Sequence, residues 1–252
     1  NGEQISYAGG LRVETFNNYK EISHSGSTAG YRAWLAYYPD KKMTIAILSN
    51  DANGNVVAAG KKIAEIFFGK PEMKTWNPER VPLTESDMKR FSGTYRSMRG
   101  IDSFTLTQRD GKLFWNQLPL TAIHKDTLYT NGMKWLFIKP GRMLIKNGAD
   151  TSSYRSVRAI DSTSRYLQSL VGTYISKEAD TEFTITVKHN SVWISRKPNT
   201  SYNLTPLYYD GYRGDEFELL EFRRDRKGKV TGFEISLSRA EKVPFTKVTD
   251  NR

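Results

Sequence analysis

The chain has 252 residues, of which 38% are hydrophobic and 12% aromatic, and it carries a formal net charge of +11. This composition is typical of a globular protein rather than a disordered chain, and no run approaches the ~18 apolar residues of a membrane span. The absence of cysteine excludes disulfides and thiol chemistry, and the scattered Lys and Arg residues form no basic helix that would indicate nucleic-acid binding.

The first section, residues 1–69, combines strand-like runs with one helical run. The strand candidates are Leu11–Phe16, Tyr19–His24, Gly30–Tyr38 and Met43–Ser49. The last is almost continuously apolar, which predicts a central strand buried on both faces. A helix is predicted from about Asn55 to Phe68. Its predicted apolar face, read from helical spacing, consists of Val56, Gly60, Ile63 and Phe67. Gly60 either weakens this helix or allows it to approach the sheet closely. We expect an antiparallel meander followed by a helix.

The rest of the chain contains an internal repeat. Residues 70–83 hold three prolines and no periodicity, which predicts a linker. Beyond it, Phe91–Tyr95 matches Leu170–Tyr174, and Phe104–Thr107 matches Phe183–Thr186 at the same offset. Each copy begins with a short helical turn and continues as short alternating strands. The predicted fold is mainly β (α+β overall), with two lipocalin-like antiparallel barrels of about eight strands each at 84–160 and 161–252.

The stretch most informative about chemistry is His24-Ser25-Gly26-Ser27, at the end of a predicted strand. Hydroxyls and a glycine at a strand edge suit the close approach of a substrate backbone. His24 offers a polarisable or cationic group, and Ser25 a hydroxyl for a substrate carboxylate or amide. Because the motif is short, a Ser/Gly-rich hairpin with an exposed histidine is the alternative interpretation.

The motifs around this stretch follow a definite order: Tyr7–Leu11, a strand, His24–Gly26, Gly30-Tyr31, a strand, Pro39-Asp40, an apolar strand, and Leu48–Asn50 before a helix. This order resembles the end of the serine penicillin-recognising fold, shared by class C β-lactamases, D,D-peptidases, esterases and D-aminopeptidases. That family builds its site from Ser-x-x-Lys, Tyr-x-Asn (or Ser-x-Asn), and Lys-Thr-Gly or His-x-Gly on an edge strand. His24-Ser25-Gly26 matches the third motif. The two barrels make the architecture similar to that of the D-aminopeptidases.

The resemblance implies a bacterial serine hydrolase, periplasmic or secreted, that cleaves amide or ester bonds of a small peptide or amide substrate through an acyl-enzyme, without a cofactor. It also implies that Ser27 supplies a backbone N–H to the oxyanion hole. The family's nucleophile motif lies well before the third motif, so we expect a fragment with no complete catalytic set that is inactive alone. We further expect the missing N-terminal catalytic portion, or a second copy, to cover the incomplete sheet edge.

Two strings imitate the absent motifs. Ser86–Lys89 fits Ser-x-x-Lys, and Tyr129–Asn131 fits Tyr-x-Asn. The first is better explained as the start of a capped helix, and the second as a strand running into an Asn-Gly turn. We therefore assign neither string a catalytic role.

A ligand-binding module is the alternative function. In that case the barrels would hold an apolar or peptide ligand, and the first section would have no catalytic role. Barrels of this size are either filled by side chains or hold one small ligand, and we expect filled interiors, with core positions at Trp115, Trp135 and Trp193. The three histidines, His24, His124 and His189, are far apart in sequence, so no metal site is predicted.

Overall fold

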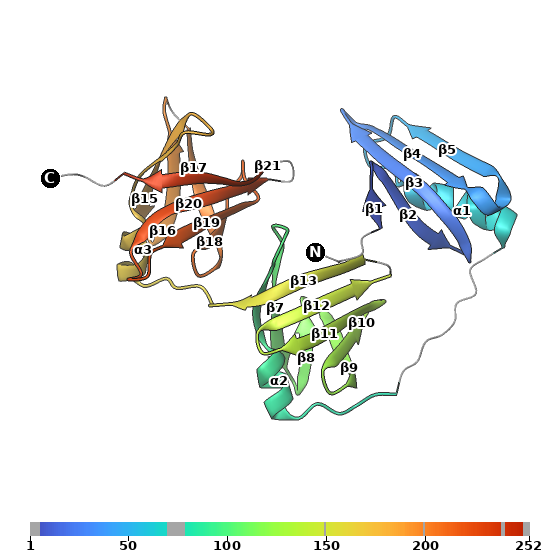
Figure 1. Ribbon diagram of the computed structural model, residues 1–252, viewed down its shortest axis with the longest axis horizontal. Coiled ribbons are helices and arrows are strands. Elements are labelled where there is room, and N and C mark those ends of the chain that lie inside the picture. The colour runs from blue at the N-terminus through green and yellow to red at the C-terminus, as the bar shows by residue number, and fades with distance from the viewer. Residues whose placement is uncertain (1–5, 70–78, 149, 199, 238–239, 249–252) are drawn as a thin grey trace. The chain divides into compact units, whose positions relative to one another are not determined.

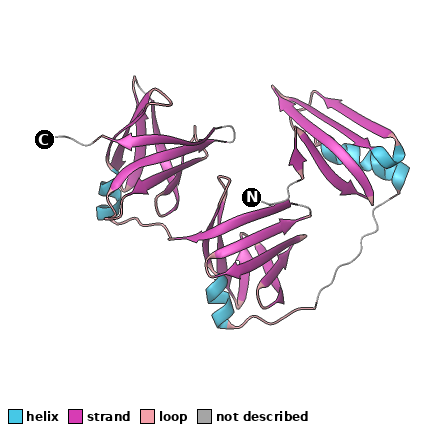
Figure 2. Ribbon diagram, viewed as in Figure 1, coloured by secondary structure: helices cyan, strands magenta, loops and turns pink. Residues whose placement is uncertain are grey.

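The structure is a computed structural model that describes residues 6–69, 79–148, 150–198, 200–237 and 240–248. The chain is mainly β (Figure 2), with an open antiparallel sheet followed by two closed antiparallel barrels. This confirms the fold class predicted from the sequence. By its contacts the chain divides into two compact units, the first extending to Arg80 and including Asn131–Lys134 and Ile145–Ser152, the second comprising the rest.

The first unit contains a five-stranded antiparallel sheet in the order β1-β2-β3-β4-β5 (Figure 1). Its strands are β1 Tyr7–Ala8, β2 Leu11–Phe16, β3 Tyr19–Thr28, β4 Tyr31–Tyr38 and β5 Met43–Ser49. A 3₁₀ turn, Pro39–Lys41, joins the last two strands. The sequence located four of the five strands, but it missed β1 and ended β3 four residues early, at His24.

The prediction that β5 is a central strand buried on both faces is wrong. β5 is an edge strand of the described sheet and pairs there with β4. Ile45 is buried, whereas Leu48 on the opposite face is 85% exposed. The apolar run was misleading because both faces of β5 carry apolar side chains, and within the described residues only one of these faces is covered.

The helix α1, Val56–Phe68, covers one face of the sheet (Figure 1). It begins after Asn55, whose side chain accepts a hydrogen bond from the backbone N–H of Ala58 at 3.0 Å. Its buried residues pack in one core with β4 and β5 side chains: Val56 and Ala64 of the helix, and Trp34, Ala36, Tyr38 and Ile45 of the strands. The predicted helix face is therefore wrong in part, because Ile63 and Phe67 are 37% and 67% exposed.

A glycine faces the sheet where α1 crosses Trp34, because the Trp34 ring fills the space between helix and strand. A Cβ atom on Gly60 would lie 2.0 Å from Cζ3 of Trp34 and 2.2 Å from Cε3. Of the two roles that the sequence left open for Gly60, the structure therefore shows the close approach.

Two eight-stranded barrels follow, each with consecutive strands as neighbours and its last strand paired with its first. Most of the predicted linker, residues 70–78, lies outside the described residues. The first barrel begins with α2 Glu85–Phe91 and continues as β6 Gly93–Ser97, β7 Ser103–Arg109, β8 Lys112–Trp115, β9 Leu118–His124, β10 Thr127–Thr130, β11 Met133–Lys139, β12 Arg142–Asn147 and β13 Asp150–Val157. The second consists of α3 Ser164–Leu170, β14 Gly172–Ser176, β15 Thr181–Lys188, β16 Ser191–Arg196, β17 Thr200–Tyr208, β18 Gly211–Arg213, β19 Leu219–Arg224, β20 Val230–Leu237 and β21 Ala240–Lys247.

The sequence repeat corresponds to a repeated contact between helix and barrel. The Tyr95 hydroxyl donates to the carbonyl oxygen of Phe91 at 3.0 Å, and the Tyr174 hydroxyl donates to that of Leu170 at 2.6 Å. Both tyrosines are buried, and in each case the bond ties the end of the short helix to the first strand of its barrel.

The barrel interiors are filled by side chains, as expected. Fully buried residues of the first barrel include Leu106, Leu113, Leu128, Trp135 and Met143, and those of the second include Ile185, Ile194, Leu220 and Phe233. The prediction that Trp193 is a core position is wrong. Trp193 alternates with buried Val192 and Ile194 and lies partly exposed on the outer surface of the barrel. There the Lys188 ammonium is 5.6 Å from its ring centroid.

The two imitation motifs have the structural roles that the sequence indicated. Ser86 and Lys89 lie in α2, whose N-cap Thr84 accepts a hydrogen bond from the backbone N–H of Asp87 in a capping box. Tyr129 and Thr130 end β10, and the turn after it has left-handed φ values of 46° at Asn131 and 82° at Gly132.

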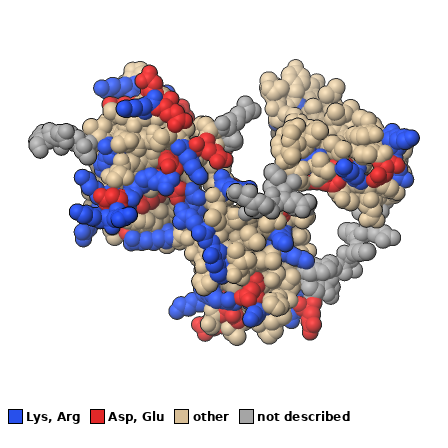
Figure 3. Space-filling model, viewed as in Figure 1, with Lys and Arg blue, Asp and Glu red and all other residues tan. Residues whose placement is uncertain are grey.

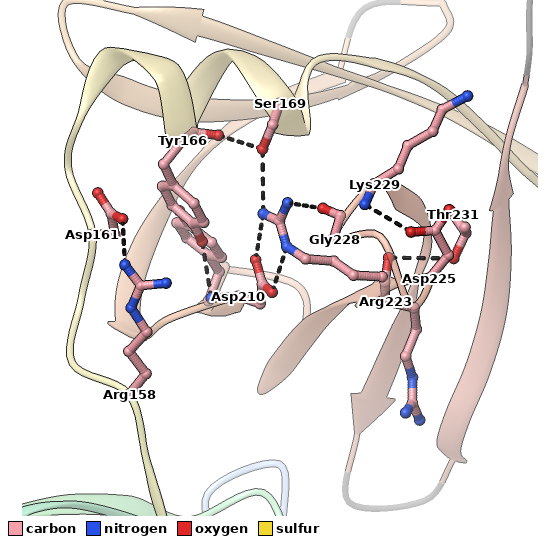
Figure 4. Close-up of polar contacts among 12 residues, drawn as sticks. Arg158, Asp161, Tyr166, Ser169, Asp210, Arg223, Asp225, Gly228, Lys229 and Thr231 are labelled. Atoms are coloured by element: carbon pink, nitrogen blue, oxygen red, sulfur yellow. Dashed lines mark hydrogen bonds and ion pairs between the residues drawn. The ribbon is translucent and has the colours of Figure 1, made fainter.

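A polar cluster fastens α3 to the second barrel (Figure 4). Arg224 on β19 donates two hydrogen bonds to the Asp210 carboxylate at 2.8 and 2.9 Å, and one to Ser169 Oγ at 3.2 Å. The Tyr166 hydroxyl accepts from the backbone N–H of Asp210 at 2.9 Å. The side chains of Arg224 and Asp210 are only 15% and 13% exposed, so each charge depends on the other for compensation.

We expect Arg224→Met to lower the free energy of unfolding of the second barrel by about 3 kcal/mol, because it leaves the Asp210 carboxylate unpaired in a largely buried position. Hydrogen exchange of peptides from α3 and β19 would measure the loss. Arg223→Met is the matched control, since Arg223 pairs with Glu234 and is 52% exposed. Its cost should stay below about 1 kcal/mol. Equal losses in the two variants would contradict the assignment of a structural role to the cluster.

We also expect Gly60→Ala to destabilise the sheet by about 1–3 kcal/mol, because the new methyl group overlaps the Trp34 ring and the helix must move away. Hydrogen exchange of α1 and β4 peptides reports this effect separately from the barrels. Gly26→Ala is the comparison, since its Cβ would meet only the Ala33 Cβ atom, at 3.9 Å. If Gly60→Ala were as stable as Gly26→Ala, the close approach would not be a constraint.

Candidate functional site

The stretch His24-Ser25-Gly26-Ser27 lies within β3, which continues to Thr28. The sequence placed it at the end of a strand, and the structure corrects this. β4 pairs with the whole stretch, placing His24 opposite Leu35 and Gly26 opposite Ala33. The pairing with β2, by contrast, runs only as far as Ser23. Among the described residues, β3 is therefore an interior strand in its first half and a free edge in its second half. A free edge can pair with an extended peptide.

Side chains alternate along β3, so the motif points to both faces of the sheet. Ser23 is buried on the face that α1 covers, and His24 and Gly26 belong to the other face, which we call the open face. The large exposed apolar side chains of the open face are Leu11, Val13, Tyr31, Leu35, Tyr37 and Leu48. In Figure 3 the visible surface of this part of the chain is mostly tan, whereas Lys and Arg gather over the barrels. His24 thus lies on a surface with few charges and several exposed apolar side chains.

An open depression of about 660 Å³ lies at the end of β3, β4 and β5. Gly26, Ser27 and Thr28 line one side of it, with Ala33 and Leu48 from the neighbouring strands. Gly26 does not have a left-handed φ, and a Cβ there would make only ordinary contact with Ala33. Neither the backbone nor the packing of the described chain requires a glycine at this position. What the missing side chain provides is free space beside the depression.

Among the residues that the structure describes, the polar partner of His24 is Tyr7 on β1. The Tyr7 hydroxyl lies 3.1 Å from Nε2 of His24, and both side chains are exposed. Tyr7 is a site residue that the sequence motifs did not reveal. The available signal was Gly9-Gly10, a dipeptide typical of tight hairpins, which would have folded Tyr7 back along β2.

The covered face under the site contains a buried carboxylate that the sequence analysis also missed. Glu21 on β3 is 1% exposed and accepts a hydrogen bond of 2.7 Å from the Tyr38 hydroxyl on β4. Burial in the first place, and then the bond to Glu21, raises the pKa of Tyr38. The Tyr38 ring packs edge-on against Phe68 of α1, with centroids 4.9 Å apart. This contact links β3, β4 and the helix directly behind the site.

The chemical groups at the site are suited to binding. They comprise the backbone of a free strand edge, one imidazole and the hydroxyls of Ser25 and Ser27. Within the described part of the chain, neither hydroxyl has a basic side chain as a hydrogen-bond partner that would activate it as a nucleophile. The described residues contain no group of three or more His, Asp or Glu side chains that could hold a metal ion. Nor do they include a helix that is both long and apolar enough to cross a membrane.

No family model matches the chain, and no curated protein does. Among solved structures, the chain is similar to the crystal structure of SurE, with 17% identity and a TM-score of 0.38 over 58% of this chain and 36% of that one. It is also similar to the octameric penicillin-binding protein homologue from Pyrococcus abyssi, with 19% identity and a TM-score of 0.26 over 76% and 35%. The structure of SurE with D-Leu gives 12% and 0.25 over 94% and 38%. The chain therefore spans little more than a third of the length of these solved chains.

We expect Tyr38→Phe to lower the free energy of unfolding of the sheet by about 1–3 kcal/mol, because the buried Glu21 carboxylate loses its hydrogen-bond donor. Hydrogen-exchange rates of β3 and β4 peptides would measure this loss. The neighbouring variant Tyr37→Phe, on the exposed face of the same strand, should change stability by less than about 0.5 kcal/mol. Indistinguishable exchange in the two variants would show that the Tyr38–Glu21 bond does not hold the strands together.

Proposed function

We propose that this chain is the C-terminal part of a serine hydrolase of the penicillin-binding or β-lactamase type, and that it supplies the strand along which the substrate binds. The observation that carries the proposal is the free second half of β3, with His24 and Gly26 on the open face and Ser27 beside the depression. An extended substrate can hydrogen-bond along such an edge. The space at Gly26 lets its backbone approach.

The reaction in this proposal is acyl transfer at an amide or ester carbonyl. A serine hydroxyl attacks the carbonyl carbon, its proton passes through a basic side chain to the leaving amine or alcohol, and water then hydrolyses the acyl-enzyme. The serine and its base belong to an N-terminal catalytic portion of the protein. This chain contributes the Ser27 backbone N–H, which stabilises the negative charge that develops on the carbonyl oxygen. His24 binds a carboxylate or amide of the substrate from the open face. Ser25 lies opposite Trp34 and projects to the other face, so its hydroxyl would bind a substrate group that reaches past the strand edge.

The open face is the surface on which that N-terminal portion would pack. Its exposed apolar side chains, among them Leu35 and Leu48, form the kind of patch that marks an interaction site. Ile66 and Phe67 on the outer side of α1 are exposed as well, at 80% and 67%. We favour the N-terminal portion over a second copy of this chain, because only the former would bring a nucleophile to the depression beside Ser27.

The finer parts of the proposal follow from the order of motifs and domains. The tandem barrels after a His-x-Gly strand favour a D-aminopeptidase-like enzyme, and that class implies a bacterial periplasmic or secreted protein. The barrels are accessory domains in this scheme. Their filled interiors count against the alternative that each holds a ligand.

The test is the intact mass of the full-length gene product after exposure to a labelled penicillin and to an active-site serine phosphonate. We expect one adduct per protein, on a serine upstream of residue 1. His24→Ala should slow labelling by the penicillin about tenfold or more, because a hydrogen bond to the substrate is lost. The matched control is His124→Ala, which removes an exposed histidine from β9 of the first barrel and should label normally.

Two labelling results would overturn the proposal. Absence of an adduct on folded full-length protein would leave ligand binding by the barrels as the better function. An adduct on a serine within residues 1–252 of the isolated chain would show that the nucleophile is not supplied from upstream. A stable dimer of the chain, detected by sedimentation, would identify a second copy as the cover of the open face.

A further inference from the structure

A tight hairpin places Tyr7 beside His24. β1 and β2 are joined by Gly9 and Gly10 alone, with Ala8 opposite Leu11. The two glycines have φ values of 59° and 78°, the left-handed pair that a two-residue type I′ turn requires. A Cβ on either glycine would meet nothing within 4 Å, so the glycines serve the backbone conformation rather than packing. The turn folds β1 back along β2 and so brings Tyr7 to a histidine 17 residues away.

The contact between these residues joins the phenol oxygen to one particular ring nitrogen. Tyr7 Oη and His24 Nε2 are 3.1 Å apart, and the ring centroids are 6.0 Å apart with a tilt of 36°. A phenol is a stronger hydrogen-bond donor than a neutral imidazole N–H, and an imidazole nitrogen is a stronger acceptor than a phenol oxygen. The favoured arrangement is therefore Tyr7 O–H donating to Nε2, which leaves the imidazole proton on Nδ1.

We infer that Tyr7 is a positioning residue for His24: it fixes the neutral imidazole as the Nδ1–H tautomer and presents that N–H to the substrate. Nδ1 has no hydrogen-bond partner among the described residues, and His24 lies on the open face. The ligand that an Nδ1–H recognises is an oxygen acceptor, such as a carboxylate or carbonyl of the substrate. The catalytic part of this inference rests on the proposed function, whereas the hydrogen bond and the tautomer belong to this chain alone.

The tautomer can be measured in the chain itself by two-dimensional NMR of the histidine ring nitrogens, recorded at alkaline pH. His24→Gln assigns the signals among the three histidines. We expect His24 to be predominantly the Nδ1–H tautomer. Tyr7→Phe, which removes only the hydroxyl, should return it to the Nε2–H form that predominates in a free histidine side chain. Tyr31→Phe, an exposed tyrosine near the depression, is the control and should leave His24 unchanged.

Activity supplies a second readout in the full-length enzyme. Tyr7→Phe should raise KM about tenfold with a smaller change in kcat, because a misoriented His24 weakens substrate binding. Equal tautomer populations at His24 and the exposed His124, or a Tyr7→Phe spectrum identical to wild type, would overturn the inference. A shifted tautomer in a full-length protein that no serine probe labels would uphold the positioning role of Tyr7 and refute the proposed hydrolase. Labelling by a serine probe in a protein whose His24 tautomer is not shifted would support the hydrolase and refute the positioning role of Tyr7.

Discussion

The pairing of β3 with β4 is the constraint on which the candidate site depends. It runs from Ile22 opposite Tyr37 to Thr28 opposite Tyr31. Because side chains alternate, a slip of one residue would turn His24 toward the helix and Ser25 toward the open face. The register is fixed from behind, where Trp34 packs against α1 at Gly60 and Tyr38 binds the buried Glu21. The position of an exposed imidazole is thus set by buried contacts on the opposite side of the sheet.

The sheet and the barrels differ in how completely their strand edges are paired and their apolar faces are covered. Each barrel closes on itself, so its strands have no unpaired edge, and its interior is filled. A short helix is bonded to each first strand, and in the second barrel Arg224 and Asp210 reinforce the attachment. The sheet has an open face with apolar side chains and a strand with a free half-edge. The unpaired strand edge and the apolar open face therefore lie in the sheet, whereas each barrel closes on itself.

Most of the fold could be predicted from local sequence patterns. Alternation located the main strands, Asn55 and Gly69 marked the limits of α1, and the matched Phe91–Tyr95 and Leu170–Tyr174 segments revealed the two barrels. The predictions that were wrong concerned which faces of a strand or helix are covered by other elements. β5 and α1 each carry apolar residues on two sides, so composition could not show that Leu48 and Phe67 are exposed. The partners of His24 and Glu21 come from other strands, and no local pattern around the motif encodes those contacts.

A protein layer on the open face would also change the polar contacts of the candidate site. At present water surrounds His24 and Tyr7, so the hydrogen bond between them contributes little to stability. A protein layer packed on Leu35 and its apolar neighbours would exclude that water, and electrostatic interactions strengthen as the local dielectric constant falls. The bond from Tyr7 to Nε2 and the interaction of the Ser27 N–H with a substrate oxygen would both become stronger. If the proposed N-terminal portion covers the open face, the same layer would both stabilise the sheet and strengthen the polar contacts of the candidate site.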